Sequence, residues 1–174
     1  MATWTVDPAH SEVQFKVKHL MINTVTGEFS SYRVTMTTDT EDLSDATITF
    51  EADINSINTK NEMRDGHLKS DDFFAAETYP TMSFASTAFT PKGNGTFTLT
   101  GNLTIRDVTK SVTLDVEYGG TMVDFYGNTK AGFEITGVIN RKEFGLAWDA
   151  VTEAGGIVVS DAVKLLMNLQ LQRQ

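Results

Sequence analysis

The sequence predicts an all-β fold in which about eight antiparallel strands close into a barrel. Apolar and polar residues alternate along one segment after another, a period typical of strands with one buried and one solvated face. Turn-forming clusters of Pro, Gly, Asn and Asp separate these segments at intervals found in barrels and sandwiches. A length of 174 residues with 40% hydrophobic residues predicts a single domain, residues 1–174, with a sizeable core.

The alternation is clearest in four segments, Val13–Val17, Ala46–Ile54, Phe97–Ile105 and Val163–Leu171. In each of them every second residue is apolar or small, and the residues between are mostly polar. The breaks between segments then set the boundaries of the other strands. The expected strands are residues 3–7, 11–20, 26–39, 45–56, 81–90, 95–106, 110–119, 129–139 and 159–173.

One stretch between two expected strands breaks this alternation. From Thr59 to Glu62 the sequence fits a capping box, which predicts that Thr59 caps a short helix. Ser70 is expected to cap a second short helical segment. A smaller helical turn is expected at Arg141–Phe144. The barrel should therefore carry a short helical excursion between two strands.

Composition and charge exclude several classes of function. A formal net charge of −9 and a pI near 4.7 oppose binding to a phosphate backbone, so no nucleic acid partner is expected. The chain has no cysteine, which removes disulfides, thiolate zinc sites and a cysteine nucleophile. The first residues resemble a strand and not a signal peptide, so the chain as written is expected to be cytoplasmic. It would be periplasmic if a signal had been removed. No apolar run approaches the ~20 residues of a membrane-spanning helix.

No motif in the sequence predicts catalysis, a metal or a cofactor. The histidines His10, His19 and His67 lack the spacing of a metal-binding helix or strand. The acidic clusters at 39–45 and 71–77 lack the order of a calcium loop and are expected to be solvated turns. Nucleophile-elbow, phosphate-loop and dinucleotide glycine patterns are absent.

The barrel interior is therefore the candidate site, and residue types leave it open whether that interior is hollow or filled. A barrel of about eight strands either fills with side chains or holds one small ligand. Room is favoured by small residues on the inward parity, Ala46, Ala52, Gly101, Ala131 and Gly137. The opposite is favoured by five phenylalanines, whose rings are large enough to fill the same volume: Phe15, Phe50, Phe84, Phe97 and Phe133.

Four groups of segments, taken in order, carry a resemblance to a known family. They are Trp4–Ser11 with Phe15 and His19, Ile57–Thr59 with Arg64–Phe74 and Tyr79–Pro80, Gly101–Lys110, and Ile139–Gly145. In this order and over nearly the whole chain, they resemble the YceI-like family of polyisoprenoid-binding proteins. The resemblance implies an extended antiparallel eight-stranded lipocalin-like barrel that holds an isoprenoid or other long-chain amphiphile. Members often form dimers, so the resemblance also implies a homodimer as one assembly of this chain. Many members are exported.

On this basis we expect the chain to bind, sequester or transport a long-chain amphiphile, without catalysis and without a cofactor. The ligand would be a polyisoprenoid, an isoprenoid quinone or a fatty acid derivative. Two alternatives stay open: a filled barrel serving as a structural or stress-response interaction module, and an enzyme acting on a lipid head group. Residues expected to contact the ligand are Phe15, Val17, His19, Phe50, Ile54, Arg64, His67, Phe84, Phe97, Leu99, Leu114, Val116, Phe133, Ile135, Met167 and Leu169.

Arg64 and His67 carry two interpretations. They lie three residues apart on one helical face and are placed to meet an anionic head group at the barrel mouth. The alternative is an ion pair of Arg64 with Asp71 or Asp72, which would give these residues a structural role.

Overall fold

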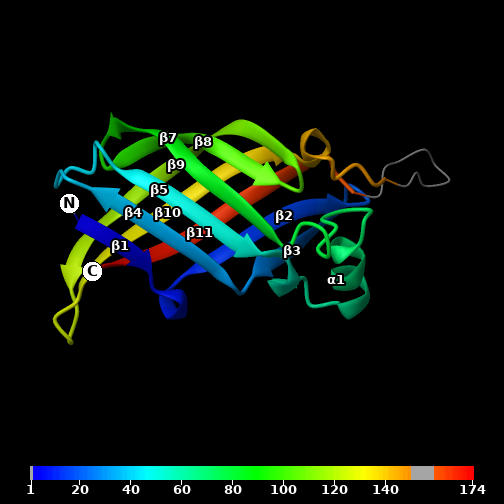
Figure 1. Ribbon diagram of the computed structural model, residues 1–174, viewed down its shortest axis with the longest axis horizontal. Helices are drawn as coiled ribbons and strands as arrows, with labels where there is room; N and C mark the ends of the chain where they lie inside the picture. The colour runs from blue at the N-terminus through cyan, green and yellow to red at the C-terminus, as the bar shows by residue number, and fades with distance from the viewer. Residues whose placement is uncertain (1, 150–158) are drawn as a thin grey trace.

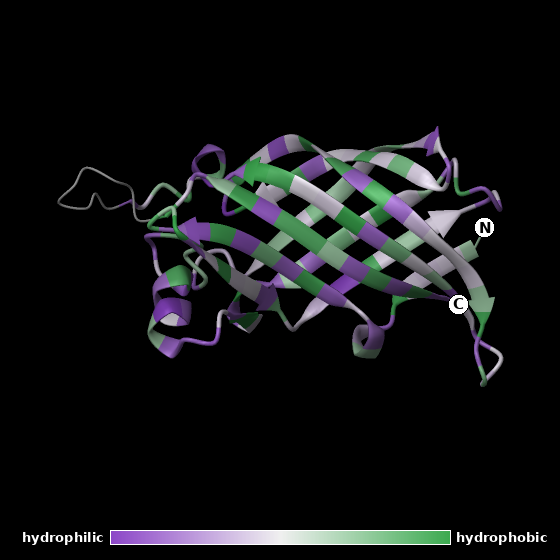
Figure 2. Cartoon of the chain, turned by 180° about the vertical axis from the view of Figure 1, so that it is seen from behind, coloured by the Kyte–Doolittle hydropathy of each residue, from purple (hydrophilic) through white to green (hydrophobic). Residues whose placement is uncertain are grey.

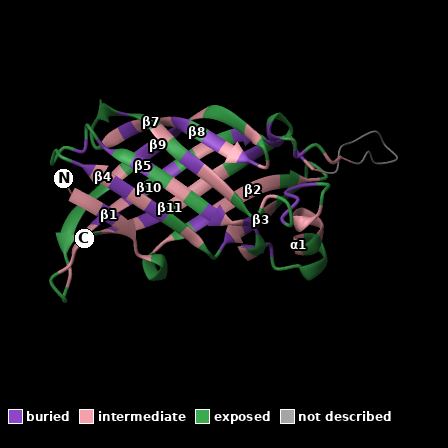
Figure 3. Ribbon diagram, viewed as in Figure 1, coloured by how far each residue is buried: buried purple, intermediate pink, exposed green. Residues whose placement is uncertain are grey.

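A computed structural model describes residues 2–149 and 159–174 of the chain, and strands dominate it (Figure 1). Hydropathy and burial both alternate along the strands, as the sequence predicts (Figures 2 and 3). One α-helix, α1, spans Glu62–Lys69, and short 3-10 turns occur at Pro8–His10, Ile54–Ser56 and Arg141–Phe144. The strands are β1 (Ala2–Val6), β2 (Glu12–His19), β3 (Asn23–Phe29), β4 (Tyr32–Thr38), β5 (Thr47–Asp53), β6 (Ile57–Asn58), β7 (Thr81–Gly93), β8 (Thr96–Ile105), β9 (Val108–Val123), β10 (Thr129–Asn140) and β11 (Ala162–Arg173).

Antiparallel hydrogen bonding closes the sheet into a barrel. The ring runs β1-β4-β5-β7-β8-β9-β10-β11 and returns to β1, which makes eight strands within the described residues. β11 pairs with β1 near its C-terminal end and with β2 over its N-terminal half. From β2 the wall continues through β3 to β6 at the end of the barrel where α1 lies (Figure 1). The expected all-β barrel is confirmed.

The single strand expected at 26–39 is wrong, because the chain breaks into β3 and β4 at two serines. The N–H of Ser30 donates to the carbonyl of Ser56, and the carbonyl of Ser31 accepts from the N–H of Asp53. The buried parity also changes across the break, from Phe29 on β3 to Val34 on β4. β3 pairs with β2 and β6, whereas β4 pairs with β1 and β5, so the break lets one stretch of chain serve two parts of the wall.

The helical excursion exists, but its caps differ from the expectation. Asn61 caps α1 through its side-chain oxygen, which accepts from the N–H of Arg64 at 3.0 Å. Thr59 instead donates its N–H and hydroxyl to the Asp65 carboxylate, at 2.8 and 2.5 Å. Ser70 ends α1, since its N–H and its hydroxyl both donate to the carbonyl of His67. The expected second helix is wrong, because residues 71–74 form turns. The Ser70 hydroxyl is bonded to the carbonyl of His67 in α1, so it does not cap a following helix. The turn at Arg141–Phe144 is confirmed.

The barrel interior is solid at the end that holds the two termini. Phe89 and Phe97 stack there with ring centroids 4.3 Å apart, and Tyr118 stacks on Phe133 at 5.2 Å. Aromatic pairs at these distances gain packing energy beyond the burial of their area. This solid half also contains the buried side chains of Trp4, Met36, Val116, Ala131 and Leu171. No helix among the described residues is long and apolar enough to cross a membrane.

Candidate ligand-binding cavity

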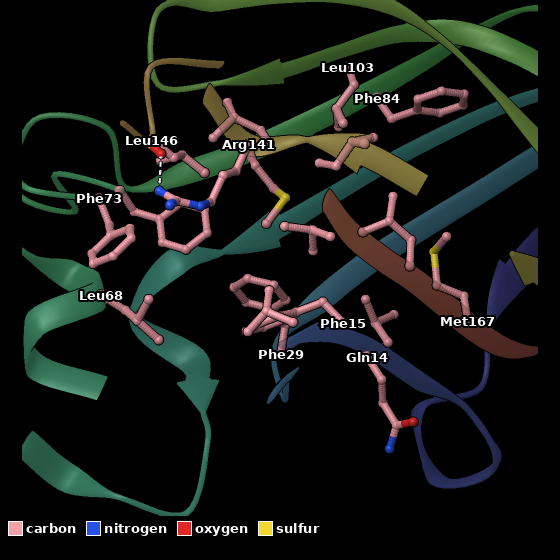
Figure 4. A pocket seen from close by; sticks show the side chains of 18 of the residues that line it. Gln14, Phe15, Phe29, Leu68, Phe73, Phe84, Leu103, Arg141, Leu146 and Met167 are labelled. Atoms are coloured by element: carbon pink, nitrogen blue, oxygen red, sulfur yellow. Dashed lines mark hydrogen bonds between the residues drawn. The ribbon is translucent and has the colours of Figure 1, made fainter. Parts of the chain in front are cut away.

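The other half of the barrel, toward α1, encloses a cavity of about 310 Å³ (Figure 4). This volume lies at the low end of the roughly 300–1,000 Å³ typical of small-molecule sites. Leu99, Ile135 and Leu169 line the cavity, and the next inward residues along their strands already belong to the solid half. The cavity is therefore blind at that end. Inward side chains that border the cavity are only half-buried, namely Phe15, Val17, Phe50, Met82, Val112, Leu165 and Met167.

Three wall residues lie flat because glycines beneath them leave room. A β-carbon at Gly27 would come within 2.2 Å of the Phe15 ring, and one at Gly101 within 2.4 Å of the Phe84 ring. At Gly137 the close atom would be a methyl carbon of Leu114, at 2.3 Å. The small inward residues therefore create room by letting larger neighbours lie along the wall, which keeps those side chains out of the centre.

Aromatic side chains from α1 and the turn after it form one side of the cavity mouth. The turn folds back on the helix, since the N–H of Phe74 donates to the carbonyl of Leu68 at 3.0 Å. Phe74 meets the Phe29 ring edge-on at 6.2 Å. His67 contacts the rings of Phe73 and Trp148, with centroids 5.1 and 4.8 Å away.

Arg141 is a buried cation in the cavity wall, with 2% of its surface exposed (Figure 4). Its Nη1 donates to the carbonyls of Leu146 and Trp148, at 2.6 and 2.7 Å. Nε donates to the carbonyl of Ser160 at 2.9 Å, and Nη2 to that of Val159 at 3.3 Å. One guanidinium thus joins the chain at 146–148 to the chain at 159–160, and it does so beside the cavity.

Arg64 and His67 have separate partners at the mouth. The Nε of Arg64 donates to the hydroxyl of Thr59 at 2.8 Å, and its Nη2 donates to the Thr59 carbonyl at 2.6 Å. His67 pairs with Asp72, with Nε2 and Oδ2 2.9 Å apart. The expected ion pair of Arg64 with Asp71 or Asp72 is therefore wrong, because the Arg64 guanidinium bonds to Thr59 and Asp72 pairs with His67.

The charged side chains of the cavity wall all belong to basic residue types. Lys18, Arg64 and Arg141 line it together with His19 and His67, and no Asp or Glu does so among the described residues. This bias is opposite to that of the whole chain, which has 23 acidic and 14 basic residues. Such a wall accommodates an apolar chain together with a neutral or anionic polar group. No group of three or more His, Asp or Glu side chains in the described ranges is placed to hold a metal ion.

The family model of the YceI-like domain matches residues 4–171. The chain belongs to the YceI-like family. A UPF0312 protein of Staphylococcus aureus strain USA300 is 36% identical over 165 residues, which cover 94% of this chain and 94% of that protein. A solved YceI protein of Campylobacter jejuni is 35% identical, with a TM-score of 0.77 and coverage of 97% of this chain and 96% of that chain.

Two more distant solved structures share the YceI-like fold. Burkholderia cenocepacia BcnA is 24% identical, with a TM-score of 0.83 and coverage of 95% of this chain and 98% of that chain. A polyisoprenoid binding domain from Saccharophagus degradans is 16% identical, with a TM-score of 0.70 and coverage of 98% of each chain. The resemblance noted from the sequence motifs is thereby confirmed.

In this YceI-like barrel, most of the residues expected to contact a ligand line the cavity. They are Phe15, Val17, His19, Phe50, Arg64, His67, Phe84, Leu99, Leu114, Ile135, Met167 and Leu169. Four others lie outside its lining. Phe97, Val116 and Phe133 belong to the solid half, and Ile54 is buried in a 3-10 turn, its N–H bonded to the carbonyl of Pro80.

Sequence reasoning missed most of the mouth. The adjacent aromatics Phe73 and Phe74 were a usable signal, because two large rings directly after a helix rarely stay in solvent. Arg141 stands in a short turn motif that offered no sign of its burial. Leu146 and Trp148 come from an irregular segment, where no periodicity distinguishes a wall residue from a surface residue.

Proposed function

We propose that the protein binds one long-chain amphiphile, with the apolar tail inside the barrel and the polar head at the mouth beside α1. The observation that carries this proposal is a blind cavity with an almost entirely apolar wall that opens toward a cluster of basic and aromatic side chains. An apolar tail of matching shape leaves water and contacts this wall, while the polar head stays at the mouth, where hydrogen-bond donors are available.

Burial of the tail supplies the affinity. Apolar burial contributes ~25 cal/mol per Å², or about 0.8 kcal/mol for each methylene group. Because the wall has few directional contacts, tails of isoprenoid and fatty type both fit this description. The Saccharophagus degradans domain of the same fold is described as polyisoprenoid binding, so an isoprenoid tail is the first to test.

The mouth favours an anionic head group. The Arg64 guanidinium is held by Thr59 through Nε and Nη2, and Nη1 has no hydrogen-bond acceptor among the described residues. A phosphate or carboxylate would supply that acceptor. A cationic head would instead face Lys18 and Arg141 with no carboxylate in the described part of the wall.

Binding without catalysis is supported by how the polar groups at the mouth are engaged. Arg141 directs its donors to backbone carbonyls, and His67 is paired with Asp72. The hydroxyl of Ser70, which is close in sequence, donates to the carbonyl of His67 and is not directed at the imidazole nitrogens. We therefore assign the site to retention of a ligand and not to its conversion.

Native mass spectrometry of freshly purified protein tests the proposal directly. We expect a bound mass that organic extraction releases as a long-chain lipid in near-stoichiometric amount. Met167→Trp fills the cavity and should shorten the longest tail accepted, whereas Val138→Trp, on the exposed face of the neighbouring strand, should not. Absence of both bound lipid and lipid uptake would contradict the proposal. Release of chemically altered lipid would indicate an enzyme instead.

The head-group preference has its own experiment. Arg64→Ala should weaken binding of a phosphorylated isoprenoid more than binding of the corresponding alcohol, and Arg64→Lys should restore part of the difference. Lys92→Ala, at an exposed position near the end of β7, is the matched control. Equal losses for phosphate and alcohol would reduce Arg64 to a structural role.

A further inference from the structure

An exposed apolar turn stands at the cavity end of the barrel. Leu20, Met21 and Ile22 connect β2 to β3, and 40%, 57% and 75% of their surfaces are exposed. His19, the residue before the turn, lines the cavity and forms a bridge with Val159, which also lines it. The turn therefore lies beside the cavity, at the same end as α1 (Figure 1).

The backbone of this turn is poorly matched to its residues. Leu20 and Met21 have φ of +53° and +59°, in the left-handed region that disfavours residues with a β-carbon. An Asn-Gly pair adopts such a turn without strain, and it would also be soluble. Among the described residues, three consecutive large apolar side chains in this strained, solvated turn gain no packing that offsets their cost.

The wall next to this turn is basic on its outer face. Lys16 points outward from β2, and Lys164 of β11 stands directly opposite it. Lys18 lies on the same strand at the exposed rim of the cavity, and its Nζ donates to the hydroxyl of Thr24 at 2.9 Å. Two like charges side by side on a sheet oppose folding slightly, in a chain whose net charge is −9. Asp161 and Asp149 are carboxylates at this edge; Lys142 approaches them at 3.2 and 3.1 Å, and Arg141 approaches Asp161 at 3.9 Å.

The same face becomes acidic toward the other end of the barrel. Glu117, Glu134 and Asn168 occupy paired positions on β9, β10 and β11, and Glu12 of β2 continues the row. On this face of the barrel, an anionic surface would attract the lysine end and repel the acidic row.

We propose that the turn Leu20–Ile22, flanked by Lys16, Lys18 and Lys164, docks on the surface of an anionic lipid bilayer. The three apolar side chains enter the boundary between head groups and acyl chains, and the lysines contact the anionic head groups. Docking places the cavity end against the membrane, so a tail passes between bilayer and barrel with less exposure to water. This inference rests on the proposed function, because a lipid carrier is the protein that needs such a surface.

Flotation of the protein with vesicles tests docking independently of any cavity ligand. We expect binding to vesicles of phosphatidylcholine with phosphatidylserine, and much weaker binding to phosphatidylcholine alone. The triple variant Leu20→Asn, Met21→Gly, Ile22→Thr should lose binding at least tenfold while its thermal stability stays equal or rises, because the turn is no longer strained. Lys16→Gln and Lys164→Gln should each weaken binding roughly fivefold.

The β9–β10 turn provides a matched control at the opposite end. Phe125 and Tyr126 are fully and almost fully exposed there, at 104% and 90%, but they lie far from the cavity. Phe125→Ser with Tyr126→Ser should leave vesicle binding unchanged. Equal binding by the triple variant and the unaltered protein, or loss of binding only in the Phe125 and Tyr126 variant, would overturn the proposal.

A transfer assay separates this proposal from the proposed function. The rate at which a fluorescent isoprenoid moves from protein to acceptor vesicles should increase with vesicle concentration and phosphatidylserine content. In the triple variant the rate should fall at least tenfold and lose that dependence, while equilibrium affinity for the isoprenoid is unchanged. Vesicle binding without isoprenoid binding would overturn the proposed function alone, and a transfer rate independent of vesicles would overturn docking alone.

Discussion

The ring of Phe15 lies against the backbone of Gly27, its partner on the neighbouring strand, so closely that a β-carbon on Gly27 would come within 2.2 Å of the ring. The contact fixes where the ring lies. A side chain of this size on the inward face would otherwise extend toward the barrel axis, which is how the aromatic pairs of the solid half are arranged. Glycine at this point therefore helps to determine that this half is hollow.

Gly27→Ala should push the Phe15 ring into the cavity. We expect the longest bound tail to shorten and the free energy of unfolding of lipid-free protein to fall by about 1–3 kcal/mol, because the ring leaves its packed position. Denaturant unfolding and affinity across a series of tail lengths measure the two effects. Unchanged tail length with a displaced ring would show that the ring position does not limit the cavity.

The same substitution at two other glycines should cost different amounts of stability. At Gly137 the obstructing atom is the flexible end of Leu114, so Gly137→Ala should cost little stability. At Gly101 a β-carbon would also come within 2.5 Å of the backbone carbonyl of Ala85. Gly101→Ala should therefore be the most destabilising of the three substitutions.

Removing the guanidinium of Arg141 should destabilise the protein strongly. Arg141→Met leaves the four backbone carbonyls that it now joins without their donor, and we expect a loss of about 3–5 kcal/mol in unfolding free energy. Arg141→Lys should recover only part, because an ammonium cannot reach all four oxygens. Lys142→Met is the control, since this neighbour is exposed and its ion pairs are worth under about 1 kcal/mol. Similar losses at 141 and 142 would contradict this account.

Asp7 should make stability depend on pH in the acid range. A hydrogen bond from Lys130 at 2.7 Å, followed by one from His10 at 2.9 Å, lowers the pKa of Asp7 from 3.8 to about 2. Because the folded-state pKa is the lower one, the stabilisation is present above pH 3.8 and is lost as the pH falls through about 2. Solvent screening reduces it to roughly 1 kcal/mol.

Asp7→Asn tests this contribution. Unfolding free energies of the variant and the unaltered protein should differ at pH 7 and converge as the pH approaches 2. Lys130→Met should abolish most of the pH dependence assigned to Asp7, since the largest cause of the pKa shift is then gone. A difference between Asp7→Asn and the unaltered protein that is constant over this range would contradict the prediction.

Alternation predicted the barrel because a period of two depends only on which face of a strand is buried. It did not locate the break between Phe29 and Tyr32, although the buried parity changes there, because the polar residues on either side mask the shift. The cap of α1 was misplaced for a related reason. Thr59 and Asn61 are both good caps, and the choice between them depends on Asp65, which binds Thr59 in the folded chain.

The sequence predicted which side chains point into the barrel, but not how far along the barrel axis each of them lies. Parity places Phe84 and Phe97 on the same inward face, yet the first lines the cavity and the second fills the solid half. The height of a residue in a barrel depends on the stagger between strands, which a single strand does not contain. Trp148 and Phe73 come from irregular segments, where only the folded chain brings them to His67.

The division into a solid and a hollow half predicts unequal costs for the same substitution. Phe97→Ala removes a ring that is 6% exposed and stacked on Phe89, so it should cost about 3–5 kcal/mol of unfolding free energy and leave tail length unaffected. Phe50 is inward-facing but half-buried at the cavity wall, so Phe50→Ala should cost less in lipid-free protein and admit bulkier tails. Denaturant unfolding of both delipidated variants, paired with affinity for straight and branched tails, separates the two positions. Equal destabilisation at 50 and 97, with no change in ligand preference at either, would mean that the cavity half behaves as a filled core and would remove the basis for a lipid carrier.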